Sequence, residues 1–285
     1  GCLVGSEMCI RDRACGEKNI LFTNNDSAYE TAISLIQKGI KVQAIIDNRE
    51  EIDSKLIIET EKNNIKIYKG YTIVDTFGYK RINSVSIMKL SKDGQKVIGS
   101  KENISCDSLG VSGGWTPAIH LFTQSGGKLK FRDDDQVFIP NTYPSNQISI
   151  GSCNGDFTLD EILINAPKLL KEFLNIKKTE YENIEIYSAF NKSKRNIWLL
   201  PSNKIVGKTK SFVDFQNDAT AKDIKLALRE GFRSIEHVKR YTTTGMGTDQ
   251  GKLGNMHALG IISETASSKI CLLYTSDAAD ERTCV

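Results

Sequence analysis

A glycine-bounded turn, GSCNGDFTL over residues 151–159, offers the clearest set of groups for binding a ligand. It follows the apolar run QISI and precedes an amphipathic segment, which indicates a strand-to-helix turn. Gly151 and Gly155 would let main-chain N–H groups approach a phosphate or ribose, and the helix N-terminus favours negative charge. The carboxylate of Asp156 would oppose a pyrophosphate. A turn that only packs helix against sheet is the alternative.

A second glycine pair stands in GGWTP, residues 113–117. Gly113 and Gly114 permit positive φ and a close approach of the main chain to a cofactor. Trp115 could cover a cofactor ring, but we expect it to fill the domain core. His120 follows on a predicted helix, where a histidine is more often structural than catalytic.

A third candidate is the basic block KRYTTTGMGTDQGK, residues 239–252, which contains three glycines and many hydrogen-bonding groups. Its cations Lys239, Arg240 and Lys252 could hold a phosphate, which arginine binds bidentately and lysine binds as a point charge. The alternative is a solvated helix end stabilised by the helix dipole.

The sequence predicts no catalytic residue and no metal site. The three histidines stand in unrelated contexts, so no Ser–His–Asp set can be assembled. None of the seven cysteines forms a C-x-x-C pair, and no histidine lies at metal-ligand spacing from them.

The elements that would position these residues begin with a βαβ unit. A strand at residues 19–24, a helix at 26–39 that ends at a glycine, and an apolar strand at 41–47 imply parallel pairing. Asp47 ends the second strand, where dinucleotide folds carry a ribose-binding acid. Residues 23–32, TNNDSAYETA, lack G-x-G-x-x-G, so we expect this lobe to be a structural insert.

Alternating segments after residue 70 predict antiparallel hairpins, and the run 106–112 predicts a strand that returns to the parallel sheet. Thr220 and Asp223 form a variant capping box before a helix, and a second helix follows over 232–242. The predicted fold class is α/β: an incomplete two-lobed FAD/NAD-binding-type Rossmann fold with a β-meander, followed by a small helical segment.

The composition excludes some classes of protein. The formal net charge is only +3, and lysine and arginine are interleaved with acids, so no nucleic-acid surface is predicted. No stretch approaches the roughly 20 apolar residues of a membrane span, and no secretory leader is evident. We expect a soluble cytoplasmic protein.

The chain divides into segments of different character. Residues 14–176 are predicted to form a partial dinucleotide-binding domain, 177–210 a connector, and 211–270 the helical segment. Residues 1–13 and 271–285 resemble translated sequencing-adapter sequence, and we exclude them from fold reasoning. The remainder is then expected to be an internal piece of a longer protein.

Three stretches carry a family resemblance: FTNNDSAYETA (22–32), CDSLGVSGGWTPAIHLFTQSGGKL (106–129) and the long segment 212–261. Together they resemble the middle of the alpha subunit of heterotetrameric sarcosine oxidases. The resemblance implies an enzyme that oxidises the N-methyl group of sarcosine with oxygen. Its products are glycine, hydrogen peroxide and a one-carbon unit that passes to tetrahydrofolate.

The resemblance also implies cofactors and partners. The alpha subunit of this family binds NAD, while FAD and a covalent FMN belong with the beta subunit. Gamma and delta subunits complete the complex, and the tetrahydrofolate site lies in a C-terminal part that this sequence lacks. By resemblance, NAD contacts fall on Ser152, Phe157 and Leu159. The positions expected at the FMN phosphate or the alpha–beta interface are Lys239, Arg240, Thr242 and Lys252.

Two other readings stay open. One is the alpha subunit of a related flavin-dependent amino-acid dehydrogenase, but several of those carry a cysteine-rich iron–sulfur motif near the block that begins here at Phe212. No cysteine lies between Cys153 and Cys271, so a cluster has no ligands there. The other is a non-catalytic assembly module.

Overall fold

The computed structural model describes residues 16–52, 54–144, 146–176, 197–202 and 210–270. The chain forms two compact units, residues 1–196 and 197–285. The two ends expected to be foreign, 1–13 and 271–285, lie outside the described residues, as does most of the expected connector. Within the described part, no helix combines the length and the apolar character needed to cross a membrane.

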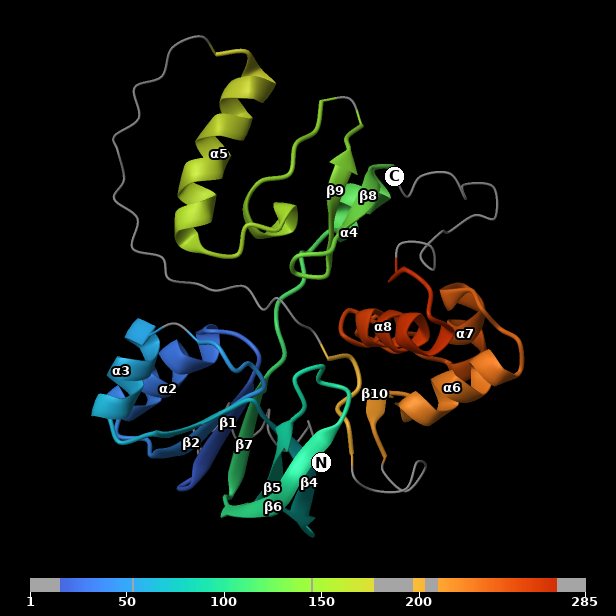
Figure 1. Ribbon diagram of the computed structural model, residues 1–285. Helices are drawn as coiled ribbons and strands as arrows, with labels where there is room; N and C mark the ends of the chain where they lie inside the picture. The colour runs from blue at the N-terminus through green and yellow to red at the C-terminus, as the bar shows by residue number, and fades with distance from the viewer. Residues whose placement is uncertain (1–15, 53, 145, 177–196, 203–209, 271–285) are drawn as a thin grey trace. The chain divides into compact units, whose positions relative to one another are not determined.

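A four-stranded sheet with the order β3-β2-β1-β7 organises the first unit (Figure 1). Its strands are β1 (Asn19–Thr23), β2 (Val42–Asp47), β3 (Lys66–Lys69) and β7 (Ser108–Ser112). All three pairings are parallel, and Thr23 lies in register with both Asp47 and Ser112. The carboxyl ends of β1, β2 and β7 therefore meet at one carboxyl edge. The predicted βαβ unit and return strand are confirmed.

Two helices, α2 (Ser27–Gln37) and α3 (Ser54–Lys62), cover one face of this sheet (Figure 1). In α2, Ala28 and Ala32 are buried, because apolar residues four positions apart lie on one helical face. Gly39 has a φ of +79°, the left-handed conformation that ends a helix. Each fully buried aliphatic side chain in this layer contributes roughly 1.5–3 kcal/mol.

The other face packs against an antiparallel meander of β4 (Tyr71–Gly78), β5 (Ile82–Leu90) and β6 (Val97–Ser105). Val85 and Ile87 of β5 are fully buried and belong to the same core as Ile20, Phe22 and Ile46 of the sheet. Alternate residues of a strand face one side, which is why every second residue contributes to this core. The predicted β-meander is confirmed.

The rest of the first unit contains α4 (His120–Gln124), the hairpin β8 (Lys128–Arg132) and β9 (Val137–Thr142), the 3-10 helix η1 (Gly151–Asn154) and α5 (Leu159–Leu174). The predicted helices are present. The strand predicted at 147–150 is wrong: Ile150 is extended, but no described strand pairs with this segment. An extended segment becomes a strand only when a neighbour binds its N–H and C=O groups.

The second unit consists of β10 (Phe212–Asp214), β11 (Ala219–Thr220), α6 (Ala221–Arg229), α7 (Ile235–Thr242) and α8 (Gly254–Ala266). The predicted capping box of Thr220 and Asp223 is present at the start of α6. Ile224, Val238 and Ile262, one from each helix, are fully buried. The three helices therefore build one core.

Candidate functional site

The glycine turn, residues 151–159, is shaped by two left-handed glycines. Gly151 has a φ of +75° and Gly155 a φ of +84°. A Cβ at Gly155 would stand 2.8 Å from Nη2 of Arg132, so only glycine fits without displacing that guanidinium. Arg132 donates a hydrogen bond of 2.9 Å to the Gly155 carbonyl. The hairpin β8–β9 thereby fixes the shape of the turn.

Three carboxylates act on this single guanidinium. The hydrogen bond from Nε of Arg132 to Asp135 is 2.7 Å long, and it raises the pKa of Arg132 above its ordinary value. The negative charges of Asp156 and Glu161 raise that pKa further, although burial opposes them. One cation faces three anions, so the turn has a surplus of negative charge. Such a field disfavours a pyrophosphate.

Asp156 is the group in this turn with unused binding capacity. Its side chain is 7% exposed, and Oδ1 accepts a hydrogen bond of 2.9 Å from Nδ2 of Asn165. Oδ2 is buried without a hydrogen-bond partner among the described residues. A buried carboxylate oxygen without a donor is unfavourable. The position therefore suits a ligand that donates a hydrogen bond.

The N-terminus of α5 is closed by its own side chains. Thr158 Oγ1 accepts from the N–H of Glu161 at 3.2 Å, completing a capping box. The Glu161 carboxylate accepts from the N–H groups of Phe157 and Thr158 at 3.0 and 3.3 Å. These N–H groups would otherwise bind a phosphate. The turn consequently fits the hydroxyl groups of a ribose better than a pyrophosphate.

The other expected contacts of the turn differ in exposure. Ser152 and Leu159 are exposed, and the Leu159 side chain retains 68% of its accessible surface. Phe157 is half-buried. The main chain of the turn is therefore held rigidly, while Ser152 and Leu159 remain accessible to a ligand or to another chain.

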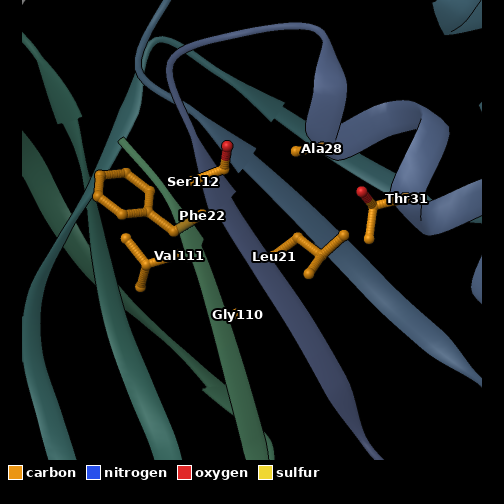
Figure 2. Close-up of a pocket in the computed structure, with 7 residues that line it drawn as sticks. All are labelled: Leu21, Phe22, Ala28, Thr31, Gly110, Val111 and Ser112. Atoms are coloured by element: carbon orange, nitrogen blue, oxygen red, sulfur yellow. The ribbon is translucent and has the colours of Figure 1, made fainter. Parts of the chain in front are cut away.

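A small pocket lies beside α2 on the face of β1 and β7 (Figure 2). Its volume is about 210 Å³, and its walls are Leu21, Phe22, Ala28, Thr31, Gly110, Val111 and Ser112. Ligand pockets usually measure roughly 300–1,000 Å³. This mainly apolar pocket is too small for a dinucleotide.

The GGWTP segment follows the carboxyl end of β7. Gly114 has a φ of +112°, and the Gly113 carbonyl accepts a hydrogen bond of 3.1 Å from Nδ2 of Asn24. The expectation that Trp115 fills the core is wrong, because its side chain is 58% exposed. Residues 113–119 form no regular element that could bury the ring. His120 begins α4, as predicted, and is exposed.

Asp47 is fully buried at the end of β2 and bound within the chain. It accepts from the Tyr29 hydroxyl at 3.0 Å and from Nη2 of Arg49 at 2.8 Å. Burial is the main reason why the pKa of Tyr29 lies far above its ordinary value. Arg49 was missed from the sequence, although its place two residues after a strand-ending acid is a usable signal. These contacts support the structural role expected for this lobe.

Some side chains of the basic block are bound within the chain, and others are exposed. Lys239 lies 3.5 Å from Glu236 in an ion pair, and the Thr242 hydroxyl donates to the Val238 carbonyl at 2.7 Å. Arg240 and Lys252 are exposed. Arg240 and Lys252 are accordingly better placed than Lys239 and Thr242 to meet a partner or a phosphate.

Hydrogen bonds to the buried carboxylate of Asp214 stabilise the loop of this block. Asp214, 4% exposed, accepts hydrogen bonds from the main-chain N–H groups of Gln216 at 2.8 Å and Gly245 at 2.7 Å. Burial alone would raise the pKa of Asp214, but the hydrogen bonds outweigh it and hold the pKa below its ordinary value. Asp214 was not predicted from the sequence, because its bond to Gly245 joins residues 31 positions apart.

In the part of the chain that the structure describes, neither the remaining histidines nor the acids build a metal centre. His237 is exposed, and Nδ1 of His257 lies 3.0 Å from the Leu253 carbonyl. Within the described residues, no group of three or more histidines, cysteines and acids could hold a metal ion.

Comparison with known proteins finds similar sequences. Residues 208–276 match the family model described as the sarcosine oxidase A3 domain. The chain is 32% identical over 256 residues to the sarcosine oxidase alpha subunit of Rhizobium meliloti (strain 1021), a match that covers 88% of this chain. The expected resemblance is confirmed. The sarcosine oxidase alpha subunit of Corynebacterium sp. (strain P-1) is 30% identical over 266 residues, or 90% of the chain.

The chain spans 24% and 27% of the lengths of these two sarcosine oxidase subunits. Among solved structures, L-proline dehydrogenase from P. horikoshii gives a TM-score of 0.46 at 18% identity, covering 91% of this chain and 47% of that one. Thioredoxin reductase from T. acidophilum gives 0.35 at 19% identity, covering 49% and 48%.

Proposed function

We propose that the chain is a segment of a sarcosine oxidase alpha subunit and serves an oxidoreductase complex. The complex would oxidise the N-methyl group of sarcosine, releasing glycine and hydrogen peroxide and passing a one-carbon unit to tetrahydrofolate. The similarity of 208–276 to the sarcosine oxidase A3 domain supports this assignment. The chain's own part is cofactor binding and subunit contact, and we assign it no catalytic residue.

The first contribution is an NAD site at the glycine turn. The observation that carries it is the buried Oδ2 of Asp156, which has no donor among the described residues. A ribose hydroxyl would supply that donor. The residues proposed to line the site are Gly151, Ser152, Gly155, Phe157 and Leu159, with Gly113 and Gly114 as further main-chain candidates. NAD supplies redox or structural chemistry when bound; the turn itself binds and orients the ribose.

The second contribution is a contact with the beta subunit, which would carry FAD and the covalent FMN, within a complex completed by gamma and delta subunits. Lys239, Arg240, Thr242 and Lys252 would lie at this interface or near the FMN phosphate. Guanidinium and ammonium groups bind phosphate by charge-assisted hydrogen bonds. The exposure of Arg240 and Lys252 supports such a role.

Titration calorimetry of the assembled complex with NAD tests the first contribution. Asp156→Asn converts an acceptor-only carboxylate into an amide. We expect NAD binding to weaken about tenfold or more, because a hydrogen bond to a charged group is worth about 1.5–3 kcal/mol. Asp134→Asn, at an exposed acid of the β8–β9 turn, is the matched control. If Asp156→Asn and wild type bound NAD with equal affinity, the proposed NAD site would be refuted.

Charge reversal tests the second contribution. Lys252→Glu should lower FMN retention or the yield of assembled complex, because an anion would replace a cation at the interface. Lys222→Glu, on the exposed side of α6, should change neither. Absorbance of bound flavin and size-exclusion chromatography report the two quantities. Unchanged values for Lys252→Glu would eliminate the interface proposal.

A further inference from the structure

The carboxyl edge of the parallel sheet is where dinucleotide folds bind their ligand. Their loop after β1 is rich in glycine, so that a pyrophosphate reaches the N-terminus of the next helix. An acid at the end of β2 then binds a ribose. In this chain the loop from Thr23 to Ser27 reads TNNDS and contains no glycine. Side chains therefore stand where a ligand would require space.

Charged side chains fill the part of this edge between β1 and β2. Nη2 of Arg49 lies 2.7 Å from the Asp26 carboxylate and 2.8 Å from the Asp47 carboxylate. Asp26 is the N-cap residue of α2 and is 1% exposed, and Asp47 is fully buried. An acid of this chain thus stands at the helix end that would attract a phosphate, and the candidate ribose acid is bound to an arginine.

Neutral side chains fill the part between β1 and β7. Nδ2 of Asn25 donates to Oγ of Ser112 at 3.0 Å and to the Ser112 carbonyl at 3.2 Å. Oδ1 of Asn25 accepts from the hydroxyl of Ser27 at 2.5 Å. Asn24 binds the Gly113 carbonyl from the same loop. The loop after β1 is in this way bonded to the end of β7.

We propose that this carboxyl edge is closed by its own side chains and takes no dinucleotide. A pyrophosphate could enter only by separating the ion pairs of Arg49 with the buried carboxylates of Asp26 and Asp47, which is strongly unfavourable. Together with the proposed function, a closed edge leaves the glycine turn as the NAD site and the βαβ unit as scaffold.

Hydrogen–deuterium exchange of the wild-type complex, with and without NAD, tests the inference without a variant. We expect NAD to slow exchange in peptides covering 151–161 and to leave exchange unchanged at 22–30 and 108–112. Slower exchange at 22–30 or 108–112 without slower exchange at 151–161 would overturn the closed edge. No change in any of these peptides would remove the NAD site proposed for the turn and leave the closed edge supported.

A pair of substitutions gives a second readout. Asp47→Asn should lower the melting temperature and leave the dissociation constant for NAD within twofold of wild type. Asp156→Asn should raise that constant about tenfold or more. A tenfold loss of NAD affinity in assembled Asp47→Asn complex would overturn the inference. If Asp47→Asn does not assemble, Ser112→Ala replaces it with the same expectation, because it removes one neutral contact of the filled edge.

Discussion

Gly245 donates its main-chain N–H to the carboxylate of Asp214 across 2.7 Å and joins two loops separated by 31 residues of sequence. The same carboxylate binds the start of the turn that follows β10 through the N–H of Gln216. A single buried acid therefore fixes the loop within the basic block. The proposed interface residues Lys239 and Lys252 flank a loop whose shape depends on Asp214.

Asp214→Asn should lower the free energy of unfolding of the subunit. Asparagine keeps one oxygen acceptor but places an N–H₂ group against donors, so we expect a loss of about 1.5–3 kcal/mol. Urea unfolding followed by circular dichroism measures it. Asp218→Asn, at an exposed neighbour, is the control and should be nearly neutral. A loss equal to that of the control would contradict the role given to Asp214.

The contribution of Asp214 should also depend on pH. Its pKa is lower in the folded state than the ordinary value of about 3.9. The folded state therefore gains stability above that ordinary value and loses it as the pH falls through the lower, folded pKa. The difference between the urea midpoints of wild type and Asp214→Asn should be largest at neutral pH and should disappear in acid. A constant difference down to the lowest accessible pH would argue against this linkage.

Gly155→Ala should destabilise the glycine turn by roughly 2–5 kcal/mol. A left-handed conformation disfavours alanine by about 1–2 kcal/mol, and overlap in a packed site adds about 1–3 kcal/mol. The new Cβ would meet Nη2 of Arg132 at 2.8 Å and Cγ2 of Ile139 at 2.9 Å.

Gly126→Ala is the matched control for this change. Its φ of +87° is nearly that of Gly155, but a Cβ there meets no atom within 4 Å. Thermal unfolding of the two variants separates the backbone effect from the steric one. Equal losses of stability would mean that Arg132 and Ile139 do not restrict the turn.

Gly260→Ala should destabilise the second unit, although alanine normally favours a helix more than glycine does. Alanine normally stabilises a helix interior by about 1 kcal/mol relative to glycine. In α8, however, the new Cβ would stand 2.1 Å from the indole of Trp198 and displace it. We expect a lower melting temperature and altered tryptophan fluorescence, recorded in a Trp115→Phe background so that Trp198 alone reports. A rise in melting temperature would show that the indole does not rest on Gly260.

Glu161→Ala should weaken the start of α5. The two N–H groups that the carboxylate binds would lose their partner, and loss of such a cap costs about 0.5–2 kcal/mol. Glu172→Ala, near the exposed end of the same helix, is the control. Circular dichroism measures the helix content, and urea unfolding measures the free energy of unfolding. Equal stability of Glu161→Ala and the control would remove the capping role.

The parallel sheet and the meander were predictable because their signals are local. A helical period flanked by two apolar runs indicates βαβ, and alternation broken by glycines indicates hairpins. The helix α8 was missed for the opposite reason. Its residues 258–262 are all buried, so no polar face marks the helical period in the sequence.

The candidate site was less predictable than the fold. The glycines of the turn are visible in the sequence, but the closing of the α5 N-terminus by Glu161 depends on a side-chain conformation. The hydrogen bond between Gly155 and Arg132 links residues 23 positions apart. Trp115 was misplaced because an apolar ring predicts burial only where other elements cover it.

The strand β7 has a neighbouring strand, β1, on one side only within the described part of the chain. Val111, near its carboxyl end, keeps 66% of its surface accessible. A row of main-chain donors and acceptors beside an apolar side chain is a template on which another extended chain can add. Concentrated solutions of this polypeptide should therefore self-associate by strand addition, and a charged residue at position 111 should improve its solubility.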